Sequence, residues 1–559
     1  MFVDSRELPG DHMLQSHVCI VGSGPVGCAI ALELAGKGLQ VVVVEAGGAA
    51  HDPTAQAAFW SEDAREPDRH SPLHLWRRRM LGGASTVWGG RCLPFSRSDF
   101  EDHAVSWPIG YEEFSAYLPR AAAFLEIGAS DFDAGTALSP QDPPFLGGFR
   151  HGDLCADTID RYSPPTNVAS RYWAETAQAA NLTVLLNAPC IEIRLDPGGS
   201  RADCAIIAPS PTKRCRVRAA SFVLAAGGLE TVRLLLASNN DRAPGLGNEN
   251  DLVGRYYMTH LVGNLGRLTT LDGASGRELS FIRTTDGIYA KRSLQLSRTA
   301  RRRTNLGAFV LRSSIGRVRD PSHGSGVLSA LYLGRYLLKN ELCVNMMRRS
   351  SGDGGSSGAG AYSRHLANVL RDSPSIVSFG YRWFVDRPRR YRKLPGYDLE
   401  RRDHTCPLEF NAEQAPNHAS RVYLGRALDP LGVPLLAVDW RSCEDDRRTV
   451  RQSFDLIRRA LAGCNSARIA SETEEEEAAA ADLWPAGGHH IGTARWSCSP
   501  REGVVDPDMQ VWSVRGLYVA GAAIFPRSGS ANPTLSAVAT AYRLADHLAA
   551  LHPLKPLRS

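Results

Sequence analysis

Apolar runs in the first 45 residues follow a strand, helix, strand order. Residues 17 to 21, His-Val-Cys-Ile-Val, form a continuous apolar run that is typical of a buried strand in a parallel sheet. An alanine-rich apolar stretch continues to about Gly36 and predicts a helix, and residues 39 to 44 form a second apolar run. Two later runs, at 221 to 225 and 517 to 520, break at glycine and predict further buried strands.

The middle of the chain has a different periodicity. Apolar and polar residues alternate in 305 to 312, 375 to 383 and 420 to 424, which predicts an antiparallel sheet. Residues 445 to 461 have helical spacing. The chain is therefore predicted to be an α/β protein, α+β overall.

Two stretches carry little chemistry. Residues 350 to 361 are rich in Gly and Ser and cannot bury enough apolar surface to order themselves, so they predict a loop, either a lid or a plain surface loop. Residues 471 to 482 place carboxylates first and alanines afterwards, which suits an exposed helix.

The turn after the first strand has the spacing of a dinucleotide site. Gly22 permits the tight turn, Gly24 lets backbone N–H groups approach a pyrophosphate, and Gly27 lets the helix pack on the strand. The second strand ends in Glu45, which is placed to accept hydrogen bonds from both hydroxyls of an adenosine ribose. No Arg stands beside Glu45, so NADP is disfavoured. An ordinary strand-to-helix turn is the alternative.

Three further segments occur with this turn in a characteristic order. Residues 80 to 91, Met-Leu-Gly-Gly-Ala-Ser-Thr-Val-Trp-Gly-Gly-Arg, form a glycine-rich loop. The apolar run at 221 to 234 follows, and then come Ala-Gly-Gly-His-His-Ile-Gly-Thr-Ala-Arg at 486 to 495 and Ser-Gly-Ser-Ala-Asn-Pro-Thr at 528 to 534. Together these segments resemble the glucose-methanol-choline (GMC) oxidoreductases, and among them the bacterial sugar, glycoside and polyol oxidases and dehydrogenases. That resemblance implies a discontinuous Rossmann-like FAD-binding domain and a substrate domain built on an antiparallel sheet flanked by helices.

The resemblance also implies which residues contact FAD. They are Gly22, Ser23, Gly24, Pro25, Val26, Gly27, Glu45, Ala46, Gly83, Ser85, Val87, Trp88, Gly89, Gly90, Cys190, Ala226, Gly521, Ala522, Pro533 and Thr534.

By the same resemblance His489 and Asn532 are the catalytic pair. His489 removes the hydroxyl proton of an alcohol while hydride passes to N5 of the flavin, and Asn532 donates a hydrogen bond to the developing alkoxide. The alternative for His489 is a structural histidine held by backbone carbonyls. The glycines at 487, 488 and 492 favour the catalytic role because they imply close approach of backbone to a ligand. His490 points away from its neighbour on an extended segment and is expected to be structural.

Residues 410 to 424 resemble the start of the C-terminal homology region of bacterial members that act on sugars and polyols. Glu413 or Gln414 is expected to face the substrate there.

Two departures from the family pattern affect the cofactor. Some members attach FAD through a histidine at a Thr-His-Trp sequence, whereas this chain has Thr86-Val87-Trp88, so FAD is expected to be non-covalent. Many FAD proteins hold the ribityl chain with a Gly-Asp pair, and this chain has Gly521-Ala522-Ala523 instead. Ribityl contacts are therefore expected from backbone or from elsewhere.

The positions of these segments predict the domain organisation. Residues 1–100, 180–255 and 486–559 form the FAD-binding domain, and residues 101–179 and 256–485 form the substrate-binding domain with connecting segments.

Composition narrows the partners. A formal charge of +5 over 559 residues does not suggest nucleic acid. The basic clusters at 77–79, 301–303 and 387–393 are expected to be solvated surface, or less readily a contact for an electron-carrier protein. The expected partners are a small-molecule alcohol and an electron acceptor, either oxygen or a quinone-like or dye-like compound. The oligomeric state stays open.

The twelve cysteines are scattered and several lie in apolar stretches, which favours reduced thiols and a cytoplasmic location. The sequence shows no secretory signal, no apolar run long enough to span a membrane and no metal-ligand spacing.

Three functions remain open. The first is FAD-dependent oxidation of an alcohol on a sugar, glycoside or other polyol. The second is a GMC-fold lyase of the hydroxynitrile type with no net redox. The third is a catalytically silent flavin-binding scaffold, which the His489 and Asn532 pair disfavours.

Overall fold

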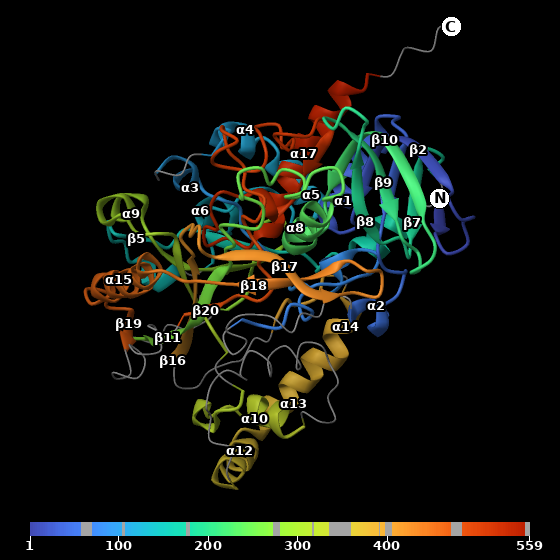
Figure 1. Cartoon of the computed structure of the whole chain (residues 1–559). Helices are drawn as coiled ribbons and strands as arrows, with labels where there is room; N and C mark the ends of the chain where they lie inside the picture. Colours follow the sequence, from blue (N-terminus) through green and yellow to red (C-terminus); the bar gives the residue numbers. More distant parts are fainter. Residues whose placement is uncertain are drawn as a thin grey trace, which may run out of the picture.

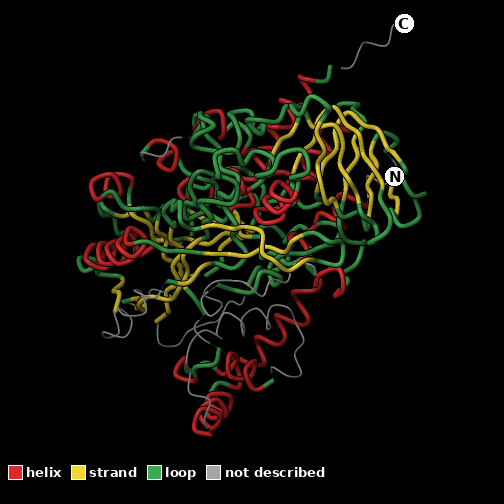
Figure 2. Tube along the Cα trace, viewed as in Figure 1, coloured by secondary structure: helices red, strands yellow, loops and turns green. Residues whose placement is uncertain are grey.

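The computed structural model describes residues 1–57, 70–102, 107–142, 144–174, 179–271, 280–315, 318–334, 359–390, 392–396, 405–470 and 483–553. Figures 1 and 2 show two regions rich in strands and a group of helices that projects from them.

The first region is a mainly parallel sheet at the N-terminal side of the molecule (Figure 1). Its strands follow the order β1-β7-β3-β2-β10-β9-β8, and β21 pairs with the end of β10. Their bounds are β1 (Phe2–Asp4), β2 (Met13–Val21), β3 (Val41–Val44), β7 (Leu182–Leu186), β8 (Cys190–Leu195), β9 (Ala202–Ile207), β10 (Cys215–Leu224) and β21 (Leu517–Val519). All eight lie within the three ranges predicted to bind FAD.

The predicted strand, helix, strand unit at the N-terminus is confirmed. β2 pairs in parallel with β3, and α1 (Pro25–Gly36) connects them. The C-terminal helix α17 (Pro533–Leu551) packs on α1, so an N-terminal and a C-terminal helix lie side by side next to this sheet (Figure 1). α8 (Gly227–Ala237) follows β10 directly. The carboxyl ends of β2, β3, β10 and β21 thus lie at one edge, where open parallel sheets bind their ligands.

The second region is antiparallel, and of the three alternating segments 305 to 312 contributes to it, whereas 420 to 424 falls at the start of a separate antiparallel hairpin. Its strands follow the order β19-β11-β16-β15-β14-β5, with β20 on β11. Their bounds are β5 (Leu154–Cys155), β11 (His260–Thr270), β14 (Leu294–Leu296), β15 (Phe309–Ser313), β16 (Thr405–Glu413), β19 (Ala467–Ala470) and β20 (Trp484–Pro485). The predicted helix is α15 (Glu444–Leu461). The strands and α15 all fall within 101–179 and 256–485, although the division into two domains stays a prediction.

Smaller elements surround these sheets. A third sheet contains β4 (Arg91–Cys92), β6 (Ile159–Tyr162), β12 (Ile282–Arg283) and β13 (Tyr289–Arg292), and β17 (Arg421–Leu428) forms a hairpin with β18 (Pro434–Asp439). Further helices are α2 (Pro53–Ala57), α3 (Arg97–Glu101), α4 (Tyr111–Ser115), α5 (Leu118–Phe124), α6 (Ala134–Ala137) and α9 (Arg298–Thr304).

The strand predicted at 375 to 383 is wrong. This segment is helical: α13 (Ser373–Gly380) continues into the π-helix Tyr381–Asp386 and then α14 (Arg387–Arg389). Phe379 and Trp383, four residues apart, lie buried on one face with their rings stacked at 5.6 Å between centroids. The alternation concealed this helical spacing, because Val377 and Tyr381 are apolar but exposed.

α13 packs with α10 (Gly326–Leu333) and α12 (Ala359–Arg371) in the projecting group of helices (Figure 1). The sequence predictions for 471 to 482, and for 350 to 361 up to residue 358, lie outside the described residues.

Candidate functional site

A cavity runs along the carboxyl edge of the parallel sheet. All but four of the predicted cofactor residues line it: Gly22, Ser23, Gly24, Pro25, Val26, Glu45, Ala46, Gly83, Ser85, Trp88, Cys190, Ala226, Gly521, Ala522, Pro533 and Thr534. The structure therefore brings together segments from both ends and the middle of the chain.

The glycines explain how backbone can approach a ligand here. Gly22 has a φ of +108°, and a Cβ on it would lie 2.6 Å from the carbonyl oxygen of Ala225. A Cβ on Gly24 would meet no atom within 4 Å and would project into open space at the start of α1. A Cβ on Gly27 would lie 2.0 Å from the carbonyl oxygen of Gly22. Gly27 thus serves the packing of α1 without lining the cavity, as its predicted role requires.

The three other predicted cofactor residues that do not line the cavity are Val87, Gly89 and Gly90. Gly90 has a φ of +72°, and a Cβ there would lie 2.8 Å from the carbonyl oxygen of Ser163. Its requirement for glycine is therefore explained by the turn itself.

Glu45 lies at the carboxyl end of β3 and is buried against the glycine turn. Its Oε2 accepts hydrogen bonds from Ser23 N at 3.2 Å and Ser23 Oγ at 2.6 Å, and its Oε1 accepts one from Gly47 N at 2.9 Å. Burial raises the pKa of Glu45, while these donors act in the opposite direction. Ser23 Oγ also accepts a hydrogen bond from Gly82 N at 3.1 Å. Glu45 and Ser23 together fix the turn, the strand end and the glycine-rich loop that follows.

Three helices begin at the cavity. α1 starts at Pro25, α8 follows Ala226, and α17 starts at Pro533, and residues at each of these starts line the cavity. Helix N-termini present unpaired N–H groups and a partial positive charge, which favours an anionic ligand such as a pyrophosphate. The residues present thus fit a dinucleotide: open space at Gly24, a carboxylate at Glu45 and three helix N-termini.

The expectation that residues 77–79 form solvated surface is wrong. Arg77, Arg78 and Arg79 all line the cavity, and Arg79 is buried. Arg77 Nη1 donates to Glu230 Oε1 at 2.7 Å. Charged residues can line a buried wall when carboxylates from other segments balance them, and a local cluster of arginines does not reveal those partners.

Asp429 provides another such carboxylate, since Arg233 Nη2 pairs with its Oδ2 at 2.7 Å. Glu230, Arg233 and Asp429 line the cavity too and were missed from the sequence. Glu230 and Arg233 lie on α8, directly after the predicted strand at 221 to 225. Their position just past that strand is a pattern from which a place at the cavity could have been predicted. Asp429 lies between β17 and β18, and no local pattern links it to the cavity.

His489 faces His260, a residue that the sequence reasoning did not single out. The segment ending at Ile491 pairs antiparallel with the residues just before β11, through the bridge between Met258 and Ile491. This pairing sets the two rings edge to face, with His260 Nδ1 and His489 Nδ1 2.6 Å apart.

The proton between these two rings can be assigned from the partner of His260. His260 Nε2 lies 3.0 Å from the carbonyl oxygen of Ser528, which can only accept, so Nε2 carries a hydrogen. Burial lowers the pKa of His260 to about 4, so the ring is neutral near pH 7 and its Nδ1 is an acceptor. His489 therefore donates from Nδ1, and a neutral His489 carries its lone pair on Nε2.

Asn532 is the N-cap residue of α17. Asn at this position commonly caps the helix through its side chain, yet the Asn532 side chain makes no capping hydrogen bond within the described part of the chain. Pro533 and Thr534 beside it line the cavity, whereas Asn532 and His489 are not among the lining residues. Both sit next to residues that are, because Gly488 and His490 also line it.

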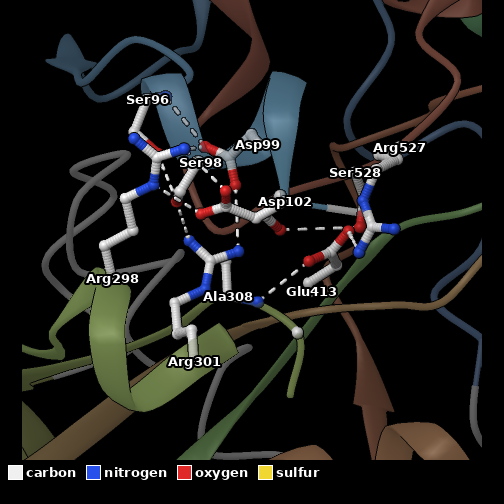
Figure 3. Close-up of polar contacts among 12 residues, drawn as sticks. Ser96, Ser98, Asp99, Asp102, Arg298, Arg301, Ala308, Glu413, Arg527 and Ser528 are labelled. Carbon is white, nitrogen blue, oxygen red and sulfur yellow. Dashed lines mark hydrogen bonds and ion pairs between the residues drawn. The ribbon is translucent and has the colours of Figure 1, made fainter. Parts of the chain in front are cut away.

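Glu413 is buried beneath the segment that leads to Asn532 (Figure 3). Its Oε2 accepts a hydrogen bond from Ala308 N at 2.8 Å. Its Oε1 lies 2.7 Å from Arg527 Nη2, an ion pair that lacks the alignment of a hydrogen bond. The carboxylate therefore neutralises Arg527 at the beginning of this segment.

Gln414 is fully buried and its side-chain amide is engaged within the protein. Its Oε1 accepts from Thr259 N at 2.8 Å and from Trp440 Nε1 at 2.9 Å, and its Nε2 donates to the Arg441 carbonyl at 2.9 Å. Its backbone N donates to Ser528 Oγ at 2.9 Å. These contacts give Gln414 a positioning role, whereas the sequence reasoning expected a substrate contact from Glu413 or Gln414.

A second ion pair lies beside this segment (Figure 3). Asp99 Oδ1 lies 3.2 Å from Arg301 Nη2, and Asp99 Oδ2 accepts a hydrogen bond from Ser96 N at 2.8 Å. Burial alone would raise the pKa of Asp99, but Arg301 and the Ser96 N–H hold it below its usual value. The pair ties α3 to α9 on the side of Gly529, where an added Cβ would meet Phe95 at 2.8 Å. These contacts fix residues 527 to 530, and so the approach to Asn532.

The described residues contain no group of three or more His, Cys, Asp or Glu side chains placed to hold a metal ion. Within the same ranges, none of the helices has both the length and the apolar character required to cross a bilayer.

Comparison with known families identifies the chain. Residues 17–259 match the family model of FAD dependent oxidoreductases, and residues 416–541 match the C-terminal model of GMC oxidoreductases. The two matches, the fold and the cavity define an FAD-dependent oxidoreductase. Within that class, the C-terminal part of the chain, residues 416–541, is a GMC oxidoreductase domain.

Two curated relatives align along almost the whole length. A 2-methyl-1,2-propanediol dehydrogenase of Mycolicibacterium austroafricanum is 22% identical, with 96% of this chain and 95% of the relative covered. A paromamine 6'-oxidase of Streptomyces fradiae is 23% identical, with coverage of 95% and 91%. A C-glycoside 3-oxidase of Arthrobacter globiformis is 32% identical over 22% of each chain.

Solved structures share the fold. An FAD-dependent oxidoreductase of Chaetomium thermophilum superimposes with a TM-score of 0.57 at 16% identity, covering 97% of this chain and all of the other. A formate oxidase of Aspergillus oryzae RIB40 gives a TM-score of 0.54 at 15% identity, with coverage of 98% and 99%.

Proposed function

We propose that this protein oxidises an alcohol group of a sugar, glycoside or other polyol to a carbonyl, with His489 as the base and FAD held non-covalently. The observation that carries the proposal is the His489–His260 contact, because it places the lone pair of a neutral His489 on Nε2. The names of the relatives, which include a diol dehydrogenase, an aminoglycoside oxidase and a glycoside oxidase, support the substrate class.

In the proposed reaction His489 Nε2 takes the hydroxyl proton of the substrate. The Nδ1–H stays directed at His260 Nδ1, so the imidazolium that forms keeps a hydrogen-bond acceptor for its charge. Asn532 donates from its side-chain amide to the substrate oxygen as negative charge develops there. When bound, FAD supplies the hydride acceptor at its N5 atom. The products are a carbonyl, a reduced cofactor and a proton on His489.

The domain assignment is part of this proposal. Residues 1–100, 180–255 and 486–559 bind FAD, and residues 101–179 and 256–485 cover the substrate. The cavity supports the first assignment, because most of its walls come from those three ranges.

One experiment tests the proposal and its alternatives. The FAD-loaded protein is mixed without oxygen with sugars, glycosides and secondary alcohols, and the oxidised flavin band is followed. Loss of that band with a polyol is the expected result, and subsequent exposure to air or to a quinone identifies the acceptor. A lyase of the hydroxynitrile type, or a silent scaffold, would leave the band unchanged with every alcohol.

A further inference from the structure

His490 belongs to a second buried chain of hydrogen bonds. His490 Nδ1 lies 2.9 Å from Tyr257 Oη, and Tyr257 Oη lies 2.9 Å from His70 Nε2. His70 Nδ1 lies 2.8 Å from the carbonyl oxygen of Ser71. His490, Tyr257 and His70 are all buried.

The donor and the acceptor of each of these hydrogen bonds can be assigned, because the series ends at the Ser71 carbonyl. Ser71 O can only accept, so His70 carries its hydrogen on Nδ1, and burial lowers the pKa of His70 and keeps the ring neutral. His70 Nε2 therefore accepts the Tyr257 hydroxyl hydrogen, and burial raises the pKa of Tyr257, so the phenol keeps that hydrogen. Tyr257 Oη must then accept from His490 Nδ1.

It follows that His490 Nε2 is an acceptor. Burial lowers the pKa of His490 well below its usual value, so the ring is neutral and its lone pair is on Nε2. This atom is buried, has no hydrogen-bond partner in the described part of the chain, and belongs to a residue that lines the cofactor cavity. An unsatisfied buried acceptor is destabilising, and a hydrogen-bond donor of a ligand would offset that cost.

We propose that His490 Nε2 accepts a hydrogen bond from a hydroxyl of the ribityl chain of FAD. Phosphate oxygens only accept, so the pyrophosphate cannot be its partner. The segment Gly521-Ala522-Ala523 lines the cavity through Gly521 and Ala522 but offers no acidic side chain to a ribityl hydroxyl. His490 lines the same cavity and carries a buried acceptor without a partner among the described residues. This inference rests on the proposed cofactor site.

The test measures FAD affinity and requires no turnover. Apoprotein is titrated with FAD and with analogues that lack one ribityl hydroxyl each, and binding is followed by flavin fluorescence. For the wild type, one of these analogues should bind about 3- to 10-fold more weakly than FAD. That difference should disappear in His490→Leu and shrink in Tyr257→Phe, while His489→Ala, the matched control, keeps it.

Two outcomes would overturn the inference. One is a His490→Leu protein that still discriminates against the same analogue. The other outcome is measured on the wild-type protein alone, so a folding defect of the variant cannot affect it. It is equal binding of all deoxyribityl analogues together with weaker binding of an FAD analogue methylated at N3 of the flavin ring. Failure of wild-type protein to bind FAD at all would instead refute the cofactor site itself.

A different observation, on the projecting helices, carries a second inference. α12 buries the polar side chain of His365, whose Nδ1 lies within hydrogen-bonding distance of Ser329 Oγ at 3.0 Å. The same helix exposes Leu366 and Leu370, which lie one turn apart and are 53% and 72% exposed. Arg364 and Arg371 are exposed as well, so the outward face of α12 mixes apolar and basic side chains, whereas a helix of a soluble protein usually turns its apolar side chains to the core.

The helix that follows has a matching stripe. Val377, Tyr381 and Phe384 lie on one face and are each more than 60% exposed. Of the eleven large apolar side chains that are exposed among the described residues, six lie between 362 and 384. Residues 359–393 contain eight Arg or Lys against two Asp.

We infer that α12 and the helix from Ser373 to Arg389 lie on an anionic lipid surface. Exposed apolar stripes flanked by arginines suit insertion at the boundary between headgroups and acyl chains, and the charge excess selects anionic lipids. The helices would lie on the membrane without crossing it.

Vesicle sedimentation of the full-length protein tests this inference. Binding is expected to vesicles of phosphatidylcholine with about 30% phosphatidylserine, to weaken with salt, and to be much weaker with phosphatidylcholine alone. The triple variant Leu370→Glu, Val377→Glu, Phe384→Glu should bind at least about tenfold less. Leu428→Glu is the matched control, since Leu428 is 60% exposed on β17, and it should bind like the wild type.

Absence of binding to anionic vesicles, or equal binding by the triple variant, would overturn the lipid assignment. Self-association of the wild type in light scattering that the triple variant abolishes, without vesicle binding, would assign the stripe to a second copy of the chain instead.

Discussion

His260 and His489 meet Nδ1 to Nδ1 at 2.6 Å, so one ring must donate and the other must accept. The Ser528 carbonyl on the far side of His260 makes His489 the donor. His260 thus selects the tautomer of the proposed base, and the Ser528 carbonyl is in turn fixed by contacts of Ser528 with Gln414.

Replacing His260 tests that relationship. His260→Phe removes the acceptor, so His489 can place its hydrogen on either nitrogen, and anaerobic flavin reduction should slow about 10- to 100-fold. His260→Asn returns an acceptor and should recover part of the rate. The measurement is stopped-flow reduction as a function of pH, because a change of tautomer also shifts the pH profile. A Phe variant with wild-type rate and profile would remove His260 from the mechanism.

Replacing the catalytic pair should separate chemistry from cofactor binding. His489→Ala should retain FAD yet slow flavin reduction by about 10² to 10⁴ fold, the usual contribution of a positioned general base. Asn532→Ala should slow the same step, because a donor to the developing alkoxide is lost.

His490→Ala is the matched control for His489→Ala. It should weaken FAD binding and affect reduction of the bound flavin much less. If His490→Ala, saturated with FAD, slowed reduction as much as His489→Ala, the base would be assigned to the wrong histidine.

The chain's patterns predicted the parallel sheet and most of the cavity because that information is local. Gly22, Gly24 and Glu45 lie within one strand, helix, strand unit, where spacing along the chain fixes position in space. Residues whose role depends on a distant partner could not be found in this way. His260 opens a strand and has no motif of its own, and Asp429 reaches the cavity from a hairpin.

Two errors have the same origin. Residues 77–79 have the sequence of a surface cluster, but Arg77 forms an ion pair with Glu230 in the fold. The sequence near residue 77 gives no indication of that carboxylate. The strand predicted at 375 to 383 depended on alternation. The segment is helical because Phe379 and Trp383, with Ile376 beside them, pack against α10 and its neighbours, while Val377 and Tyr381 remain exposed.

Changing Glu45 should affect cofactor affinity more than folding. The carboxylate accepts three hydrogen bonds from the glycine turn and its surroundings and lies where a ribose is expected. Glu45→Ala should lower FAD occupancy about tenfold or more, and Glu45→Gln less, because the amide keeps one acceptor oxygen. Flavin content and equilibrium titration measure the effect, with circular dichroism as the control for folding. Unchanged affinity in both variants would place the ribose contact elsewhere.

Stability should fall in mild acid because His260 resists protonation. Its folded pKa of about 4 lies below the ordinary value of 6.5, so the unfolded chain binds the proton first as the pH drops. This contribution is fully present above pH 6.5 and is lost as the pH falls towards 4, by about 3 kcal/mol at most. Urea unfolding at several pH values should show a shallower decline for His260→Asn than for the wild type. Identical slopes would mean that other groups control the acid limit.

The attachment of FAD can be tested directly. Val87 stands where some relatives carry the linking histidine, and it does not line the cavity. His490 does line it, with an unprotonated Nε2, so it could act as a nucleophile if a covalent bond formed, as could the Cys190 thiol in the same cavity. The hydrogen-bond assignment requires that this nitrogen keep its lone pair for a ribityl hydroxyl. Acid precipitation of the yellow protein should therefore release all flavin into the supernatant, with a mass equal to that of free FAD. Flavin that stayed with the pellet, and that His490→Leu set free, would show that His490 is bonded to the cofactor and would refute both non-covalent binding and the acceptor role.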